Sequence, residues 1–143
     1  MRILVDADAC PVIDIIEELA IKHEIPVILF ADTSHIFISD YSEVRIIDKG
    51  ADAVDFAIMG VCQKGDIIVT HDYGVAAMAL GMGAKAIHHT GREYTDDNIE
   101  QLLMDRHLAK RERAKGKRKF KRSSRDTKGS FREKFEELLI SPE

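Results

Sequence analysis

Five aspartates stand at predicted element boundaries, where they could hold a divalent metal ion. They are Asp6, Asp8, Asp52, Asp55 and Asp72. Asp6 and Asp8 directly follow the apolar run 3–5, and two residues apart in an extended chain they lie roughly 6–7 Å from each other. Such carboxylates repel each other unless a cation joins them, so the pair indicates a metal site. The alternative is that one aspartate caps a helix and the other is solvated.

The other three aspartates are predicted to reach the same place. Asp52 and Asp55 open a predicted helix and share a face of its first turn. Asp72 follows a predicted strand at 67–69. If the strands are parallel, these side chains meet at the carboxyl edge of the sheet, where open α/β folds bind ligands.

Carboxylates with few histidines around them suit Mg²⁺ or Mn²⁺ better than zinc. A pair of such ions can activate water and stabilise the leaving oxygen in phosphodiester cleavage. We therefore predict all five aspartates as metal ligands, with Asp6, Asp52 and Asp72 as the catalytic set. His71 is a further possible ligand, although a lone histidine at a strand end is more often structural.

The elements that must position these residues alternate along the chain. Apolar periodicity predicts helices at 11–23, 53–62 and 73–80, one from residue 96, and one from Ser130, where Ser130 and Glu133 form a capping box. Apolar runs predict strands at 3–5, 26–31, 44–47, 67–69 and 84–88, and a turn at 91–94. This order predicts a three-layer α/β/α sandwich with a mainly parallel sheet.

The length of 143 residues suits one α/β domain, predicted at 1–113. A mobile basic linker is predicted at 114–129, followed by a helix at 130–143 that packs on the domain. The sequence has no apolar run long enough to span a membrane and no signal peptide. Cys10 and Cys62 are far apart, which favours a reduced, cytoplasmic setting. Cys10 lies near a helix start, which could lower its thiol pKa, although a small residue beside a turn is the simpler interpretation.

Charge is divided unevenly along the chain. Residues 1–105 hold 19 acidic and 7 basic residues, whereas residues 106–134 hold 14 basic and 3 acidic residues. A basic segment on an acidic body predicts a nucleic-acid partner, with RNA favoured, because phosphates attract such a segment in any sequence. The alternative is that the segment folds back on its own acidic body. The sequence contains neither a GxxxxGK[ST] loop nor a GxGxxG loop.

Four segments together resemble the bacterial YaiI/YqxD family, which is regarded as PIN-like. They are 5–12, 49–55, 65–72 and 91–99. The resemblance implies an α/β/α fold and, by analogy with PIN-like nucleases, a metal-dependent nuclease site. Asp6, Asp52 and Asp72 match the acids of that site, while Asp8 and Asp55 are additions of this family. For the helix carboxylate of many PIN domains, Asp14 or Glu17 would have to serve.

Two other functions fit the same residues. In a haloacid-dehalogenase-like phosphatase, Asp6 and Asp8 would supply nucleophile and acid/base, Asp72 would hold magnesium, and Thr33 would supply a hydroxyl. The sequence offers no convincing lysine or cap domain for that reaction. In a non-catalytic RNA- or ribosome-associated protein, the acids would bind metal or only cap helices. The oligomeric state is left open, with a dimer as one option.

Overall fold

The computed structural model describes residues 1–50, 52–114 and 127–140, and its centre is a six-stranded sheet. The strands are β1 (Ile3–Asp6), β2 (Val27–Asp32), β3 (Glu43–Ile47), β4 (Ile67–Val69), β5 (Lys85–Ile87) and β6 (Glu93–Tyr94). Their order is β3-β2-β1-β4-β5-β6, and β6 alone is antiparallel to its neighbour. The predicted α/β class with a mainly parallel sheet is confirmed.

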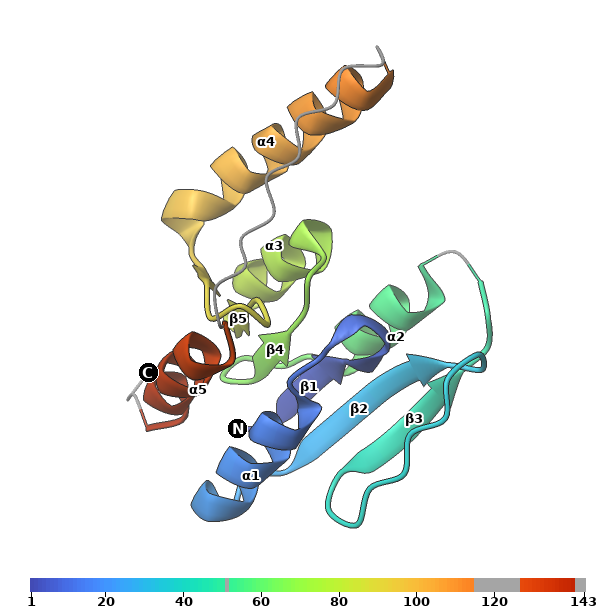
Figure 1. Cartoon of the computed structure of the whole chain (residues 1–143), viewed down its shortest axis with the longest axis vertical. Helices are drawn as coiled ribbons and strands as arrows, with labels where there is room; N and C mark the ends of the chain where they lie inside the picture. Colours follow the sequence, from blue (N-terminus) through green and yellow to red (C-terminus); the bar gives the residue numbers. More distant parts are fainter. Residues whose placement is uncertain (51, 115–126, 141–143) are drawn as a thin grey trace.

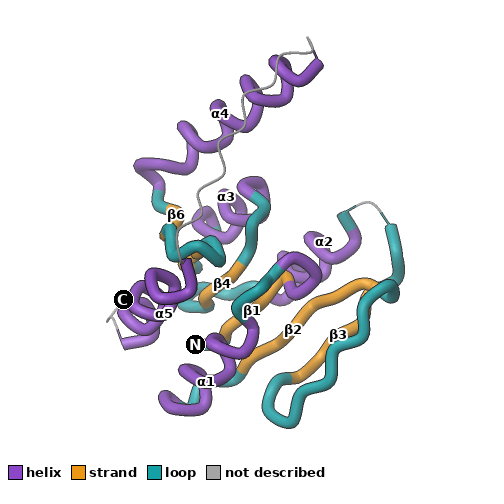
Figure 2. Tube along the Cα trace, in the orientation of Figure 1, coloured by secondary structure: helices purple, strands orange, loops and turns teal. Residues whose placement is uncertain are grey.

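Helices cover both faces of this sheet. They are α1 (Ile13–His23), α2 (Ala53–Val61), α3 (Tyr73–Gly81), α4 (Asp96–Ala114) and α5 (Thr127–Ile140), with a short 3-10 helix, η1, at Ala7–Ala9. Figure 1 shows α1 and α5 on one side of the strands, α2 and α3 on the other, and α4 extending away from the body. The same arrangement is drawn by element type in Figure 2.

The sheet is buried on both faces because its central strands are apolar throughout. Ile3 and Val5 pack into the layer of α1 and α5, while Leu4 between them packs into the layer of α2 and α3. Phe131 and Phe135 of α5 are fully buried, with their rings stacked 5.0 Å apart. The two faces of β1 are thus filled by different helices, and its carboxyl end is fixed between them.

The helices at the two ends of the described chain begin at residues other than predicted. Pro11 lies before α1 because η1 occupies the turn after β1, where the Asp8 carboxylate accepts a hydrogen bond from the Asp32 backbone N–H at 2.9 Å. Ser130 lies inside α5, which begins at Thr127. A capping box is worth only about 1 kcal/mol, so tertiary packing can override it. The predicted linker falls largely on residues 115–126, which lie outside the described residues.

The segment predicted as a turn at 91–94 contains strand β6, which that prediction missed. Tyr94 pairs with Ala86 of β5, is buried, and donates its hydroxyl to the Thr70 carbonyl at 3.2 Å. Two residues are too short a run to show strand periodicity, so the sequence alone did not predict this pairing. The hairpin carries the chain around the carboxyl end of β5, beside Thr70.

Acidic and basic side chains hold α5 against the body. The guanidinium of Arg132 pairs with Glu18, and Lys134 lies 3.5 Å from Glu93. Glu136 accepts from Lys22 and contacts His23, each at 2.8 Å. Two basic residues of the 106–134 segment therefore pair with the acidic body, as the fold-back alternative expects for its last part.

Gly91 should tolerate no larger residue. Its φ is +98°, and an added Cβ would lie 2.9 Å from the carbonyl oxygen of Ser130 in α5. We expect Gly91→Ala to lower the free energy of unfolding by about 1–3 kcal/mol, from backbone strain and this contact.

Gly60→Ala is the matched control, because Gly60 lies within α2 and an added Cβ meets nothing within 4 Å. This change should leave stability unchanged or raise it by about 1 kcal/mol. Urea unfolding of the two variants measures the difference. Equal midpoints would contradict the close contact of the hairpin with α5.

Candidate metal and nucleic-acid site

The carboxyl ends of β1 and β4 form the point where the strand order reverses. The chain leaves β1 toward β2 on one side, and β4 pairs with β1 on the other. Asp6 is the last residue of β1 and is 8% exposed. Its Oδ2 accepts a hydrogen bond from the Thr70 hydroxyl at 3.4 Å and lies 3.9 Å from Nδ1 of His71. This is the place where open α/β sheets bind ligands.

Asp72 follows β4 and begins α3. Its Oδ1 accepts hydrogen bonds from the backbone N–H groups of Gly74 at 2.7 Å and Val75 at 3.1 Å. Its own N–H donates to the Thr70 hydroxyl at 3.0 Å. Thr70 therefore connects Asp6 and Asp72 through hydrogen bonds. Asp72 also caps α3, as the helix-capping alternative expects.

Asp52 and Asp55 reach this edge from α2. Asp52 precedes the helix with φ at +64°, a conformation that aspartate tolerates better than most residues, and its side chain is exposed. Partial burial raises the pKa of Asp55 to about 6, with further contributions from the negative charges of Asp72, Asp6 and Asp52. The charges of Asp6, Asp52 and Asp72 thus all act on Asp55, and we call these four residues the acidic edge.

Burial also raises the pKa of Asp6, while nearby His71 opposes that shift. The charges of Asp8 and Asp72 raise the pKa of Asp6 further. A carboxylate with raised pKa is one whose negative charge is poorly compensated. Burial is the largest cause for both Asp6 and Asp55, and neighbouring negative charges add to it.

The raised pKa of Asp55 predicts how the stability of the fold depends on pH when a chelator is present. The folded state holds this proton more tightly than the unfolded state, so the stabilisation is present below about pH 4 and is lost as pH rises toward about 6. Asp55→Asn should therefore raise the melting temperature at pH 7 and change it little at pH 4.

Thermal unfolding between pH 4 and pH 7 with EDTA checks this expectation, and Asp40→Asn at an exposed position is the control. A wild-type advantage over Asp55→Asn at pH 7 would show that the charge of Asp55 is already compensated.

Asp8 points elsewhere. Its Oδ2 accepts from the Asp32 N–H, and its Oδ1 lies 2.9 Å from Nδ1 of His35. Of the described residues, Asp8, Asp32 and His35 form the one group of three or more potential ligands with ligand atoms all within 4.8 Å of one another. The sequence prediction missed Asp32 and His35. The position of Asp32 at the end of a strand neighbouring β1 was the available signal.

Glu17 and Asp14, the two candidates for the helix carboxylate of PIN domains, have other environments. Glu17 accepts hydrogen bonds from the hydroxyls of Ser39 and, at 2.5 Å, Ser42. It therefore fixes the loop that precedes β3. Asp14 is exposed on α1.

Burial raises the pKa of Cys10 to about 11, which agrees with the simpler interpretation of Cys10 as a small residue beside a turn. Beyond β5, the rings of His88 and His89 lie with their centres 4.1 Å apart and their planes tilted by 35°. Burial lowers the pKa of His88 to about 4, and its Nδ1 accepts from the Thr90 N–H at 3.1 Å. His88 is therefore neutral at pH 7 and shapes the hairpin.

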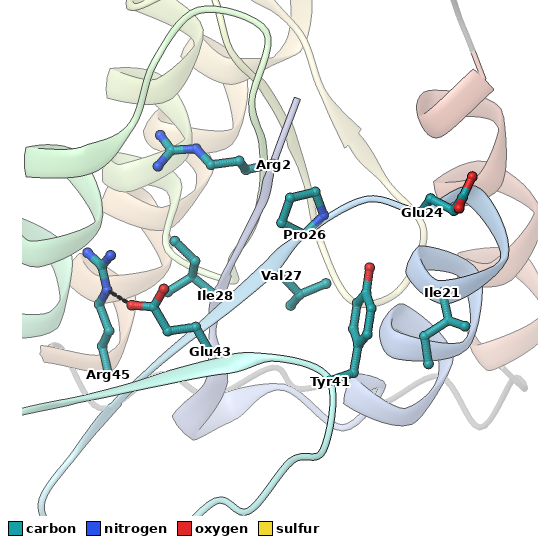
Figure 3. Close-up of a pocket in the computed structure, with 9 residues that line it drawn as sticks. All are labelled: Arg2, Ile21, Glu24, Pro26, Val27, Ile28, Tyr41, Glu43 and Arg45. Atoms are coloured by element: carbon teal, nitrogen blue, oxygen red, sulfur yellow. Dashed lines mark hydrogen bonds and ion pairs between the residues drawn. The ribbon is translucent and has the colours of Figure 1, made fainter.

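A pocket of about 580 Å³ lies at the opposite edge of the sheet (Figure 3). It is lined by residues at the amino ends of the strands, among them Arg2, Pro26, Val27, Tyr41 and Arg45. Arg2 is tied to Asp66 at 2.8 Å, and Arg45 pairs with Glu43. The predicted site residues do not line this pocket, so the candidate site is separate from this cavity.

The fold and the acidic edge together define an α/β protein with carboxylates at the switch point of a parallel sheet. The chain belongs to the YaiI/YqxD family, because the family model described as "Uncharacterized BCR, YaiI/YqxD family" matches residues 4–141. The resemblance seen in the sequence is thereby confirmed.

Relatives match over nearly their whole length. A UPF0178 protein of Clostridium acetobutylicum is 52% identical, over 95% of this chain and 92% of its own. One of Lachnoclostridium phytofermentans is 51% identical over 99% and 98%. One of Bacillus cereus is 45% identical over 98% and 99%. No solved structure matches this chain. Among the described residues, no helix is both long and apolar enough to cross a membrane.

Proposed function

We propose that this protein is a divalent-metal-dependent nuclease that cleaves phosphodiesters of RNA. The observation that supports the proposal is that Asp6 and Asp72, which stand at the ends of β1 and β4 at the switch point, act electrostatically on Asp55 of α2. Their mutual repulsion contributes to the raised pKa of Asp55, which is about 6. Carboxylates that repel one another serve stability poorly, because like charges in partial burial destabilise the folded state.

The donor atoms are of the type that the proposed cofactor prefers, although they do not all lie within 4.8 Å of one another as those of Asp8, Asp32 and His35 do. Asp6, Asp55 and Asp72 would hold Mg²⁺ or Mn²⁺, both of which prefer carboxylate oxygens. When bound, such an ion lowers the pKa of water and stabilises charge on phosphate oxygens. Thr70 orients Asp6 through its hydroxyl, at 3.4 Å. Asp52 is exposed at the rim, where it would act on the ion at longer range.

The basic segment 106–134 supports a nucleic-acid substrate. α5 returns the chain to the hairpin, where Gly91 meets the backbone of Ser130. That hairpin follows β5, the strand next to β4, so the end of the segment lies on the same side of the fold as Asp72. Lysine and arginine near this edge would bring in phosphates that the acidic edge by itself repels. Cys10 and Cys62 are free thiols, which suits the reducing cytoplasm.

One observation favours a second candidate, a non-catalytic RNA-binding protein. The Asp72 carboxylate caps α3 through two hydrogen bonds, which is a sufficient structural reason for its presence. The phosphatase alternative has less support. It needs Asp8 beside Asp6 at the substrate, whereas Asp8 bonds the Asp32 backbone and contacts His35.

Metal binding is the first test of the nuclease proposal. An ion that binds only the folded state raises its stability by about 2.7 kcal/mol at a hundredfold excess over the dissociation constant. We expect manganese to raise the melting temperature of the wild type and to have a much smaller effect on Asp6→Asn. The exposed Asp40→Asn is the control and should respond as the wild type does. A wild-type melting temperature that stays constant through millimolar manganese would contradict the proposal.

A further inference from the structure

Three side chains outside the acidic edge converge beside the end of β2. Asp8 comes from η1, Asp32 ends β2, and His35 follows in the next loop. Nδ1 of His35 lies 2.9 Å from Oδ1 of Asp8 and 3.6 Å from Oδ1 of Asp32. One ligand atom of each residue lies within 4.8 Å of the other two.

These separations match those of ligands around one metal ion. Two ligand atoms bound at about 2.1 Å and seen from the metal at 90–110° lie roughly 3.0–3.4 Å apart. The measured 2.9 and 3.6 Å lie close to that range. An ion could therefore enter with only small movements of the side chains.

A second observation points to a ligand. Oδ1 of Asp8 is shielded from solvent and, among the described residues, accepts no hydrogen bond. Its neighbour is the His35 nitrogen, which lies at contact distance without the alignment of a hydrogen bond. A shielded carboxylate oxygen that accepts no hydrogen bond is unfavourable in the folded state. A cation between the two groups would satisfy this oxygen.

The surroundings orient these groups and leave them accessible. Oδ2 of Asp8 accepts from the Asp32 N–H at 2.9 Å, and Oδ1 of Asp32 accepts from the Ser34 N–H at 2.8 Å. Such outer hydrogen bonds fix the ligands of metal sites. His35 is 52% exposed in its side chain, so an ion can approach from solvent.

We propose that Asp8, Asp32 and His35 form a separate binding site for a first-row transition-metal dication. One imidazole and two carboxylates favour Zn²⁺ or Co²⁺ over Mg²⁺, which prefers oxygen ligands alone. The site shares no residue with the acidic edge and does not depend on the nuclease proposal. Asp8, predicted as a ligand beside Asp6, belongs to this second site.

The test is Co²⁺ titration of the chelator-treated full chain, followed by calorimetry and by visible absorption of the bound ion. We expect one saturable Co²⁺ event that excess Mg²⁺ does not displace. His35→Ala and Asp32→Asn should each weaken it at least tenfold. His23→Ala is the control, because His23 lies at the end of α1, contacts Glu136 and should leave the event within twofold.

Both variants should fold, so that a loss of Co²⁺ binding can be assigned to the site. His35 is half exposed, and Asn at position 32 still accepts from Ser34, so melting in chelator should show both variants folded. Asp55→Asn should keep this event even where it loses the manganese effect at the acidic edge, which separates the two proposals. Absent saturable binding in the wild type, or unaltered binding in folded His35→Ala, would show that Asp8 and His35 form only an ion pair.

Discussion

Asp72→Asn should slow manganese-dependent cleavage of single-stranded RNA by about a hundredfold or more while leaving the chain folded. The change removes one negative charge from the acidic edge, which weakens any ion held there. Asn caps a helix about as well as Asp, so the bonds from Gly74 and Val75 to Oδ1 can persist. The melting temperature in chelator should therefore stay the same or rise.

Asp96→Asn is the matched control, because Asp96 also stands in the first turn of a helix, α4, and is exposed. It should cleave at the wild-type rate. RNA binding by both variants should remain, since the basic segment is intact. An Asp72→Asn protein that cleaves as fast as the wild type would reduce Asp72 to a helix cap and contradict the proposed mechanism.

Neutralising the basic segment should have the largest effect on affinity. Residues 115–125 contain seven lysines and arginines. If each reaches one phosphate of a single strand, the slope of log affinity against log salt includes roughly −5 from this stretch. Affinity would then fall about a thousandfold between 50 and 200 mM salt. Replacing all seven by glutamine should flatten that slope.

A double replacement of Lys49 and Lys64, both exposed and outside the segment, provides the control. It should leave the slope nearly unchanged. Fluorescence anisotropy of labelled RNA across the salt series measures both variants. A neutralised segment with the wild-type slope would favour the alternative in which these charges face the protein's own acidic body.

The fold was largely predictable because the central strands are uninterrupted apolar runs. Ile3, Leu4 and Val5 can only be buried on both faces, which requires a parallel sheet covered by helices. The same topology places Asp6 and Asp72 at the ends of the neighbouring strands β1 and β4. β6 was not predictable, because Tyr94 is held by tertiary contacts with Ala86 and Thr70 and not by a local pattern.

The cluster at Asp32 escaped prediction for a different reason. Its ligands come from two segments joined by the register of β1 and β2, and no spacing in the sequence marks that register. Asp8 contacts residues that follow β2 and points away from Asp6, although the two aspartates are close in the sequence. Side-chain direction after a strand depends on the turn that follows, and here that turn is η1.

Chelator-reversible cleavage by the wild-type chain tests the central claim most directly. Purified protein is incubated with end-labelled single-stranded RNA in manganese, in magnesium and in EDTA, beside Asp6→Asn prepared in the same way. We predict cleavage in either metal, none in EDTA, recovery when metal is restored, and loss in Asp6→Asn. Wild-type protein that binds the RNA and leaves it intact in both metals, or equal cleavage by Asp6→Asn, would contradict a nuclease centred on the acidic edge.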